Sequence, residues 1–356
     1  MDKKTVKIAV DAMGGDKAPG AVIQGCVDAL AADKDIFIYL TGDEALLKRG
    51  LSGLSYDEDR LEIVPSTEVI TNEEHPAFAI KKKRNSSIVI AQRLVREGKA
   101  DAFVSAGSTG AILVGGQILI GRLKGVHRPA LAPLMPTTKG ITLLIDCGAN
   151  MDAKPTNLVQ FAQMGSIYMK DYVGIKNPTV GILNVGAEEA KGNELVRETF
   201  PLLKECQDIN FIGSVEARDI PLGAADVVVT DAFAGNVALK MYEGSATAIL
   251  TLLKNTLTSS LKTKIGAALI IKDLKSQLKA YDVSQYGGAP MLGLKGLVVK
   301  AHGSSDAKEI ATAIGQAAAF IRKDIIGKIS EAVSGEKERT EAHEAGQAGG
   351  EAGDRP

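Results

Sequence analysis

Several features that would assign this chain to a well-known class of protein are missing from its sequence. Its 42 Lys and Arg residues are balanced by 43 Asp and Glu residues, a net charge of −1, so the chain has no general electrostatic attraction to nucleic acid or anionic lipid. It has only three cysteines, Cys26, Cys147 and Cys206, which lie far apart without a CxxC pair. This pattern suits a reducing compartment and argues against a disulfide framework or a thiolate metal site.

No segment predicts a signal peptide or a membrane-spanning helix. The chain begins with charged residues that lead directly into a strand-like run, so we expect no signal peptide and a cytoplasmic location. The longest uncharged stretch, residues 102–121, contains Ser, Thr, Gln and several Gly residues. These residues suit a buried strand, a turn and a packed helix better than they suit a bilayer.

Familiar catalytic signatures are also missing. There is no GxSxG turn of a serine hydrolase, no GxGxxG dinucleotide turn, no GxxxxGK[ST] loop, and no pair of histidines at metal-ligand spacing. Cys147 follows a predicted strand and is the best candidate for a reactive thiol, but a buried core cysteine is the favoured interpretation because free cysteines are usually buried. We therefore expect neither a metal site nor a cofactor.

What the sequence does contain is a repeated pattern of β-branched run, Gly-rich turn and helix. Hydrophobic residues make up 45% of 356 residues, enough for a large core. Strands are predicted at residues 7–11, 36–40, 61–64, 101–105, 141–145, 180–184, 210–212, 226–230 and 297–300. Alternating strands and helices predict an α/β fold, a three-layer αβα sandwich around a largely parallel sheet.

Two segments depart from this pattern. Residues 237–280 read as long helices without a strand, and we expect a protruding helical insertion there. Residues 331–356 are rich in Gly, Ala and Glu without periodicity, which is typical of a disordered tail. We therefore predict a single α/β catalytic domain over residues 1–330 that includes the insertion.

The turns at the strand ends carry the candidate functional residues, because ligands of parallel α/β sheets bind there. The segment SAGSTGA at 105–111 joins a strand to a helix. Gly107 and Gly110 allow close backbone approach, and Ser108 and Thr109 add hydroxyl groups beside the free N–H groups of a helix start. This combination favours an anion-binding turn. The alternative is a tight turn that needs glycine only for its backbone dihedrals.

Other strand-end turns offer one polar side chain each. Lys191 is either a phosphate- or oxyanion-binding cation or a solvated lysine, and Asn236 is either a helix N-cap or an amide that polarises a carbonyl. Asn150 and His302 occupy similar turns. Asp16, after the first strand, is interpreted as a helix cap or a site-shaping residue rather than a metal ligand.

Two surface features predict contacts with partners. The basic run Lys81, Lys82, Lys83 and Arg84 is either a solvated face or a docking site for an acidic partner. Leu261, Ile265 and Leu269 are spaced four apart with lysines beside them, as in an interfacial membrane helix. Packing in a dimer explains the same spacing.

Taken together, the strand-end segments resemble one family, the bacterial phosphate acyltransferases of phospholipid synthesis, also called acyl-ACP:phosphate acyltransferases. The similarity runs in order from about residue 6 to residue 325. It is carried by residues 8–16 (IAVDAMGGD), 82–87, 105–111, 128–133, 146–155, 184–186, 191–194 (KGNE), 215–219, 226–236, 286–289 and 300–305.

This resemblance implies a fold like that of phosphotransacetylases and isopropylmalate dehydrogenases. It implies reversible transfer of a fatty acyl group from acyl carrier protein to inorganic phosphate, and the acyl phosphate then serves a membrane glycerol-3-phosphate acyltransferase. It also implies a homodimer with peripheral association at the inner face of the cell membrane. Lys191 and Asn236 are the catalytic residues by resemblance. Residues 107–110 would hold phosphate, and Asn150 and His302 would assist.

Three other functions stay open at this point. The acyl donor could be coenzyme A instead of a carrier protein. A metal- and NAD-dependent dehydrogenase of the same broad fold is less favoured, because its fingerprints are missing. A catalytically idle scaffold for lipid enzymes has no use for Lys191, Asn236 and two Gly-rich turns.

Overall fold

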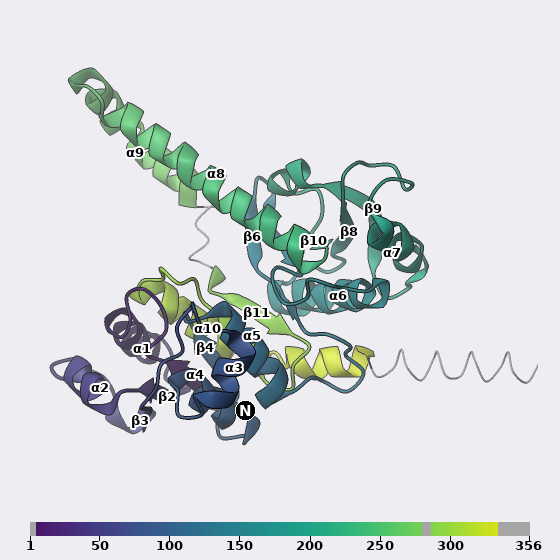
Figure 1. The fold of residues 1–356 in the computed structure, drawn as a ribbon. Coiled ribbons are helices and arrows are strands. Elements are labelled where there is room, and N and C mark those ends of the chain that lie inside the picture. The colour runs from purple at the N-terminus through teal and green to yellow at the C-terminus, as the bar shows by residue number, and fades with distance from the viewer. Residues whose placement is uncertain (1–4, 280–285, 334–356) are drawn as a thin grey trace, which may run out of the picture. The chain divides into compact units, whose positions relative to one another are not determined.

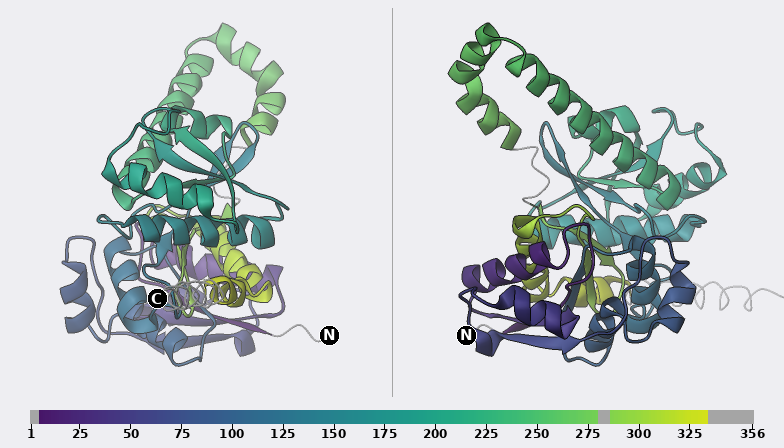
Figure 2. Two further views of the ribbon diagram at one scale, coloured as in Figure 1. Left: turned by 90° about the vertical axis from the view of Figure 1, so that its right-hand side faces the viewer. Right: turned by 60° about the vertical axis from the view of Figure 1, so that its left-hand side comes forward.

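The computed structural model describes residues 5–279 and 286–333 (Figures 1 and 2). The chain divides into two compact units. The first unit is built from residues 1–129, 171–174 and 290–356, and the second from residues 130–170 and 175–289. Each unit has its own sheet, whereas the sequence predicted one domain around one sheet.

The first unit alternates strands and helices, as Figure 1 shows. Its elements are β1 (Val6–Asp11), α1 (Gly20–Ala32), β2 (Ile36–Gly42), α2 (Glu44–Leu51), β3 (Leu61–Pro65), α3 (Pro76–Lys82), α4 (Ser87–Arg96), β4 (Ala102–Ser105), α5 (Thr109–Gly115), β11 (Ala289–Leu292), β12 (Leu297–Lys300) and α10 (Ala307–Arg322). Short helical segments are η1 (Glu58–Arg60) and η2 (Gly116–Ile120).

The sheet of the first unit runs in the order β3-β2-β1-β4-β12-β11. The pairs β1–β2, β2–β3, β1–β4 and β4–β12 are all parallel. Helix α1 connects β1 to β2, its neighbour on one side in the sheet. Helix α4 leads from β3 to β4, the neighbour of β1 on the other side. Because such crossovers are right-handed, α1 and α4 cover opposite faces of the sheet. Helix α10 packs on α1. The unit therefore has three layers, with the sheet between two layers of helices.

The second unit repeats this construction with a smaller sheet. Its elements are β5 (Ala130–Leu131), β6 (Leu134–Thr137), β7 (Gly140–Ile145), α6 (Pro155–Ile167), β8 (Thr179–Asn184), α7 (Glu194–Glu205), β9 (Asn210–Glu216), η4 (Ala217–Leu222), β10 (Val227–Val229), α8 (Ala232–Thr258) and α9 (Leu261–Lys279). The segment η3 (Tyr168–Val173) follows α6.

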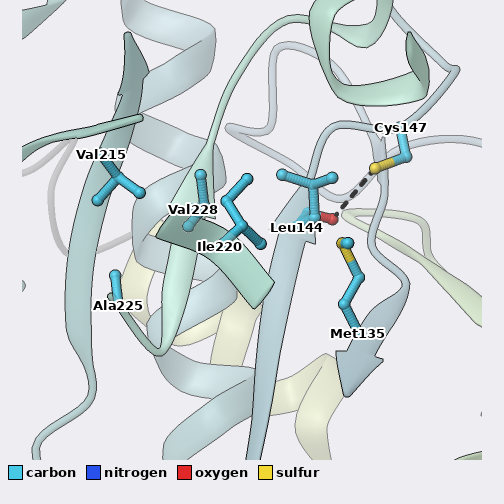
Figure 3. Close-up of a cluster of buried hydrophobic side chains, with 7 residues drawn as sticks. All are labelled: Met135, Leu144, Cys147, Val215, Ile220, Ala225 and Val228. Carbon is cyan, nitrogen blue, oxygen red and sulfur yellow. Dashed lines mark hydrogen bonds between the residues drawn. The ribbon is translucent and has the colours of Figure 1, made fainter. Parts of the chain in front are cut away.

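The sheet of the second unit runs β6-β7-β10-β8-β9 and is parallel except for the β6–β7 pair. Side chains of its central strands alternate between two buried faces. Leu143 and Val227 face α6, where a Cβ on Gly165 would lie 2.8 Å from Val227 Cγ1. Leu144 and Val228 instead belong to a buried cluster with Met135 and Ile220, drawn in Figure 3. Part of α8 packs against that cluster.

The predicted α/β class with largely parallel sheets is confirmed, and all nine predicted strands are present. Strands β5, β6 and β11 were not predicted. The tail was expected from residue 331, but residues 331–333 still complete a helix. The rest of that prediction lies outside the described residues.

Helices α8 and α9 form the helical insertion that the sequence predicted between residues 237 and 280. They pack against each other as a hairpin that extends away from the sheet of the second unit (Figures 1 and 2). Leu261, Ile265 and Leu269 are 76%, 58% and 80% exposed on α9. In the described part of the chain, no helix has both the length and the apolar character needed to cross a membrane.

The close packing of α1 on α10 gives a test of the fold. A Cβ on Gly25 of α1 would lie 2.7 Å from the Ala307 carbonyl oxygen and from Ile310. Gly25→Ala should therefore lower the free energy of unfolding by about 1–3 kcal/mol. Nothing lies within 4 Å of a Cβ on Gly315 of α10, so Gly315→Ala should raise it by about 0.5–1 kcal/mol. Equal denaturant midpoints for the two variants would contradict this packing.

Candidate functional site

The candidate residues of the site divide between the two units. Residues 107–110 and His302 belong to the first unit, and Asn150, Lys191 and Asn236 belong to the second. In both units they follow the carboxyl ends of strands that are neighbours in the sheet, as the sequence predicted.

In the first unit, a buried carboxylate supports the Gly-rich turn. Asp11, at the end of β1, is 1% exposed. Its Oδ2 accepts a hydrogen bond from Ser105 Oγ at 2.7 Å, and Ser105 Oγ accepts one from the N–H of Gly107 at 2.9 Å. Burial raises the pKa of the Asp11 carboxyl, although hydrogen bonds from Ser87 and Ser105 oppose that shift. Asp11 thus fixes the start of the turn through Ser105.

The two glycines of this turn are required by packing. A Cβ on Gly107 would lie 3.1 Å from Asp11 Oδ2, and one on Gly110 would lie 2.4 Å from Pro76 Cγ in α3. Ser108 is buried and caps α5, with its Oγ accepting from the N–H of Ala111 at 3.5 Å. Thr109 is exposed. The turn therefore offers the first backbone N–H groups of α5 and the hydroxyl of Thr109 for binding an anion.

His302 lies in the turn after β12, beside β4 in the sheet. The N–H of Ser304 donates to His302 Nδ1 at 3.3 Å, and Ser304 Oγ lies 2.9 Å from the same nitrogen. Asp16 is tied to the same turn, because its N–H donates to the carbonyl of Gly303 at 2.8 Å. The suggestion that Asp16 caps a helix is wrong, since α1 is capped at Pro19.

In the second unit, Asp146 organises the turn after β7. It is fully buried, and its carboxylate accepts hydrogen bonds from the N–H groups of Leu131, Gly148, Ala149 and Asn150 and from Asn150 Nδ2, all at 2.7–3.2 Å. Burial raises the pKa of this carboxyl against the effect of these donors. Asn150 therefore uses its amide on Asp146, which indicates a structural role for that group.

Asn150 also connects the turn to α8. Its carbonyl accepts from the N–H of Ala232, the first residue of that helix, at 3.0 Å. The helix is capped by Asp231, whose Oδ1 accepts from the N–H of Ala234 at 2.8 Å. Asn236 is therefore not an N-cap. It is half-buried one turn into α8, and within the described residues its amide has no hydrogen-bond partner.

Lys191 projects from the turn after β8. It is 53% exposed and forms an ion pair with Glu188, Nζ to Oε1 at 3.0 Å. The hydrogen bond from Lys191 holds the pKa of the Glu188 carboxyl below its usual range. An exposed pair of this kind contributes little to stability, so Lys191 can exchange Glu188 for a bound anion at small cost.

The backbone of Lys191 is anchored by Asn184, the last residue of β8. Asn184 is 7% exposed, and its Nδ2 donates to the Lys191 carbonyl at 3.2 Å and to Ser214 Oγ at 3.0 Å. Its Oδ1 accepts from the N–H of Val185 at 2.8 Å. A Cβ on Gly192, whose φ is +106°, would lie 2.7 Å from this oxygen. Asn184 is therefore the residue that positions Lys191.

Sequence reasoning did not single out Asp11, Asp146 or Asn184 as individual residues. Each is the last residue of a predicted strand or the residue just after one, and each is polar where the preceding residues are apolar. A buried polar side chain at that position needs hydrogen-bond partners, and the following turn supplies them. A polar residue at the end of an apolar strand was therefore the signal in the sequence that could have identified these three residues.

The basic run after α3 is only partly free. Lys83 is held by Glu74 at 2.7 Å and by the Val69 carbonyl at 2.7 Å. Arg84 Nε donates to the Lys81 carbonyl at 3.3 Å, and the Lys82 ammonium lies 5.4 Å from the centre of the exposed Phe78 ring. The exposed cations are thus Lys81, Lys82 and the outer part of Arg84. They lie on the element that packs against α5.

Cys147 is buried in the cluster of Figure 3, and its Sγ donates to the Leu144 carbonyl at 3.5 Å. Burial raises the pKa of this thiol well above its usual range. The interpretation as a core cysteine is therefore the one that the geometry supports. Over residues 5–279 and 286–333, no three His, Cys, Asp or Glu side chains gather to hold a metal ion.

Known proteins of similar sequence cover nearly the whole chain. The family described as "Fatty acid synthesis protein" matches residues 6–328. A phosphate acyltransferase from Clostridium perfringens is 52% identical over 92% of this chain and 97% of its own length. One from Alkaliphilus oremlandii is 50% identical over 92% and 98%.

Solved structures show the same fold at low sequence identity. A phosphotransacetylase from Streptococcus pyogenes has a TM-score of 0.61 at 17% identity, covering 90% of this chain and 94% of its own. A phosphotransacetylase from Staphylococcus aureus has a TM-score of 0.55 at 18% identity, covering 88% and 94%. The extent and level of the sequence similarity show that the chain belongs to the phosphate acyltransferase family, described as fatty acid synthesis proteins.

Proposed function

We propose that the protein transfers a fatty acyl group reversibly from acyl carrier protein to inorganic phosphate, and so makes acyl phosphate for glycerol 3-phosphate acylation in phospholipid synthesis. The observation that carries this proposal is the position of Lys191 in the turn after β8 and of Asn236 one turn into α8, the helix after β10, in a chain 52% identical to a phosphate acyltransferase. Both side chains have polar atoms that the fold does not use up.

The reaction needs no protein nucleophile. A phosphate oxygen attacks the thioester carbonyl, a tetrahedral oxyanion forms, and the C–S bond breaks as the thiol leaves and takes a proton. The products are acyl phosphate and the carrier-protein thiol. Such a step depends on holding two reactants together and on stabilising negative charge. A buried, protonated Cys147 is consistent with direct transfer.

We assign these tasks to the polar groups that remain available. Lys191 leaves Glu188 and neutralises phosphate or the oxyanion, and the Asn236 amide orients one of them. The backbone N–H groups of residues 107–110, with the hydroxyl of Thr109, bind phosphate, and the imidazole of His302 assists. Asn150 is assigned to holding the start of α8, because its amide is engaged with Asp146.

The apolar residues of α9 support two further parts of the proposal. Leu261, Ile265 and Leu269 are exposed together with Ile270 and Ile271. Such a surface suits contact with lipid or with a second copy of the chain. We propose peripheral association with the inner face of the cell membrane, where a glycerol-3-phosphate acyltransferase would use the product, and a homodimer.

The proposed reaction is tested by incubating the purified protein with acyl carrier protein thioester and phosphate and trapping acyl phosphate with hydroxylamine. Lys191→Ala and Asn236→Ala should each lower kcat/KM by about 10²–10³-fold, the usual effect of removing an oxyanion donor. Asn184→Ala should also lower it, because the turn that carries Lys191 loses its anchor.

The Cys147→Ala variant is the control and should keep its turnover. Full activity in Lys191→Ala and Asn236→Ala would discard the assigned site while keeping the reaction. Turnover of acyl-coenzyme A but not of the acyl carrier protein would move the assignment to a coenzyme A-dependent acyltransferase. If neither donor gives product, the result would favour the interpretation of the protein as a catalytically idle scaffold for lipid enzymes.

Docking of the acidic carrier protein is proposed for Lys81 and Lys82, with Arg84 beside them and Lys83 holding their segment to Glu74. Lys81→Glu combined with Lys82→Glu should raise the KM for the acyl carrier protein at least fivefold, while the KM for phosphate stays unchanged. The variant Lys34→Glu with Lys124→Glu makes the same change in net charge elsewhere in the first unit and is the control. Equal KM values for the two double variants would remove the docking role.

Membrane association is tested with vesicles containing anionic lipid. Leu261→Glu combined with Ile265→Glu should abolish co-sedimentation, because two charges replace the apolar face, while acyl phosphate formation without vesicles continues. Ile212→Glu, at an exposed apolar residue on β9, should bind vesicles like the unchanged protein. If light scattering instead shows that the double variant has become monomeric or aggregated, the face packs against protein.

A further inference from the structure

Two cavities adjoin each other along α8 in the second unit. The first has a volume of about 470 Å³ and the second about 270 Å³. Ala217, Ala238 and Met241 line both of them. The two cavities therefore adjoin at these residues, and we call them together the α8 groove.

The first cavity begins at the strand-end turns. Its polar lining there consists of Asn184, Asn193, Thr230 and Asp231. Asn184 holds the Lys191 turn, Asn193 caps α7 through the N–H of Val196 at 3.0 Å, and Asp231 caps α8. The polar groups at this end are thus largely engaged in the fold.

The walls beyond this end are apolar. They include Leu158, Ile182, Leu183, Leu195, Val196, Phe233 and Val237. Phe233, Val237 and Met241 are 68%, 54% and 70% exposed, so these side chains keep contact with water that an apolar ligand would displace. Concave, mostly apolar walls of this volume are typical of a small-molecule site.

The groove starts beside both proposed catalytic residues. Gly192 and Asn193 follow Lys191 directly, and Val237 follows Asn236 directly, and all three line the first cavity. A thioester carbonyl held by Lys191 and Asn236 would thus leave its alkyl chain at the mouth of the groove. This step rests on the proposed function.

The second cavity continues away from the strand ends. Met135, Ile220, Pro221 and Tyr242 line it, together with Ser245 and with Arg218, whose exposed guanidinium is paired with Glu216 at 3.0 Å. Met135 and Ile220 belong to the buried cluster of Figure 3, so one side of the cavity is set by the core. The Tyr242 hydroxyl donates to the Pro136 carbonyl at 2.8 Å, so its polar atom is paired and its ring is left for apolar contact.

We propose that the α8 groove binds the fatty acyl chain of the substrate and the product. The carbonyl lies at the strand-end turns and the methyl end lies toward Met135 and Ile220. Polar groups at the strand-end turns and mostly apolar walls along the rest, with Arg218 and Ser245 as the exceptions, match the polarity of a fatty acyl thioester. Each methylene that the groove covers should improve binding about fourfold, the value for transfer of one CH₂ from water.

The proposal predicts a dependence on chain length that one substitution removes. Met241→Trp fills the junction of the two cavities. It should lower kcat/KM at least tenfold for palmitoyl carrier protein and leave butyryl carrier protein within about twofold. It should also weaken binding of a fluorescent C18 fatty acid at least tenfold. Leu252→Trp is the control, because Leu252 is 68% exposed on the same helix and lines neither cavity.

The outcomes separate this proposal from the proposed function. If the unchanged protein makes no acyl phosphate but binds the fatty acid, and Met241→Trp weakens that binding, the groove stands and the function fails. If Met241→Trp changes neither binding nor the chain-length profile, the groove is overturned while the function stands. If it lowers turnover equally for all chain lengths and dissociates the protein in light scattering, the groove is an interface between copies of this chain and the proposal is overturned.

Discussion

The geometry of the second unit depends on the buried carboxylate of Asp146. Five N–H donors surround it, and a buried carboxylate without them would cost several kcal/mol. These bonds fix the turn after β7, and the carbonyl of Asn150 then fixes the first residue of α8. The position of Asn236 therefore depends on the buried carboxylate of Asp146. Asp11 has the same role toward Gly107 in the first unit.

The sequence predicted the strands well, because their physical signal is strong. Strand β10 is a buried run of three valines, and β7 ends in the buried apolar residues Leu143, Leu144 and Ile145. Strand β6 has four residues, contains Pro136 and pairs along its whole length with β7 at the edge of the sheet, so its signal in the sequence is weak. The same sequence signal did not reveal that the strands belong to two sheets. A strand–turn–helix pattern is the same whichever sheet the strand joins.

The sequence predicted where along the chain the candidate residues lie, but it did not predict their hydrogen-bond and ion-pair partners. Strand ends could be located from the sequence, and Lys191 and His302 lie in turns that follow strands, whereas Asn236 lies one turn into the helix after β10. The partners of polar side chains depend on contacts between distant segments, such as Asn184 with Ser214 or Lys83 with Glu74. Asn150 was assigned to the substrate because nothing in its turn shows that Asp146 occupies its amide. Of the two alternatives for Asn236, the N-cap is excluded because Asp231 holds that position, and both residues suit it by residue type.

Accounting for hydrogen bonds separates the residues that build the turns from those left for chemistry. Four residues use side-chain polar atoms in hydrogen bonds to backbone or side-chain groups of the fold: Ser105, Ser108, Asn184 and Asp231. Their loss would act on the substrate only through the geometry of a turn. Lys191 and His302 instead make contacts that are exposed and local in sequence, and the Asn236 amide has no hydrogen-bond partner among residues 5–279 and 286–333. Groups of this second kind can change partners without unfolding a turn, which is what binding and releasing phosphate and an oxyanion requires. By the same reasoning Gly107 and Gly110 serve packing against Asp11 and Pro76, which leaves the backbone N–H groups of that turn for the proposed binding of phosphate.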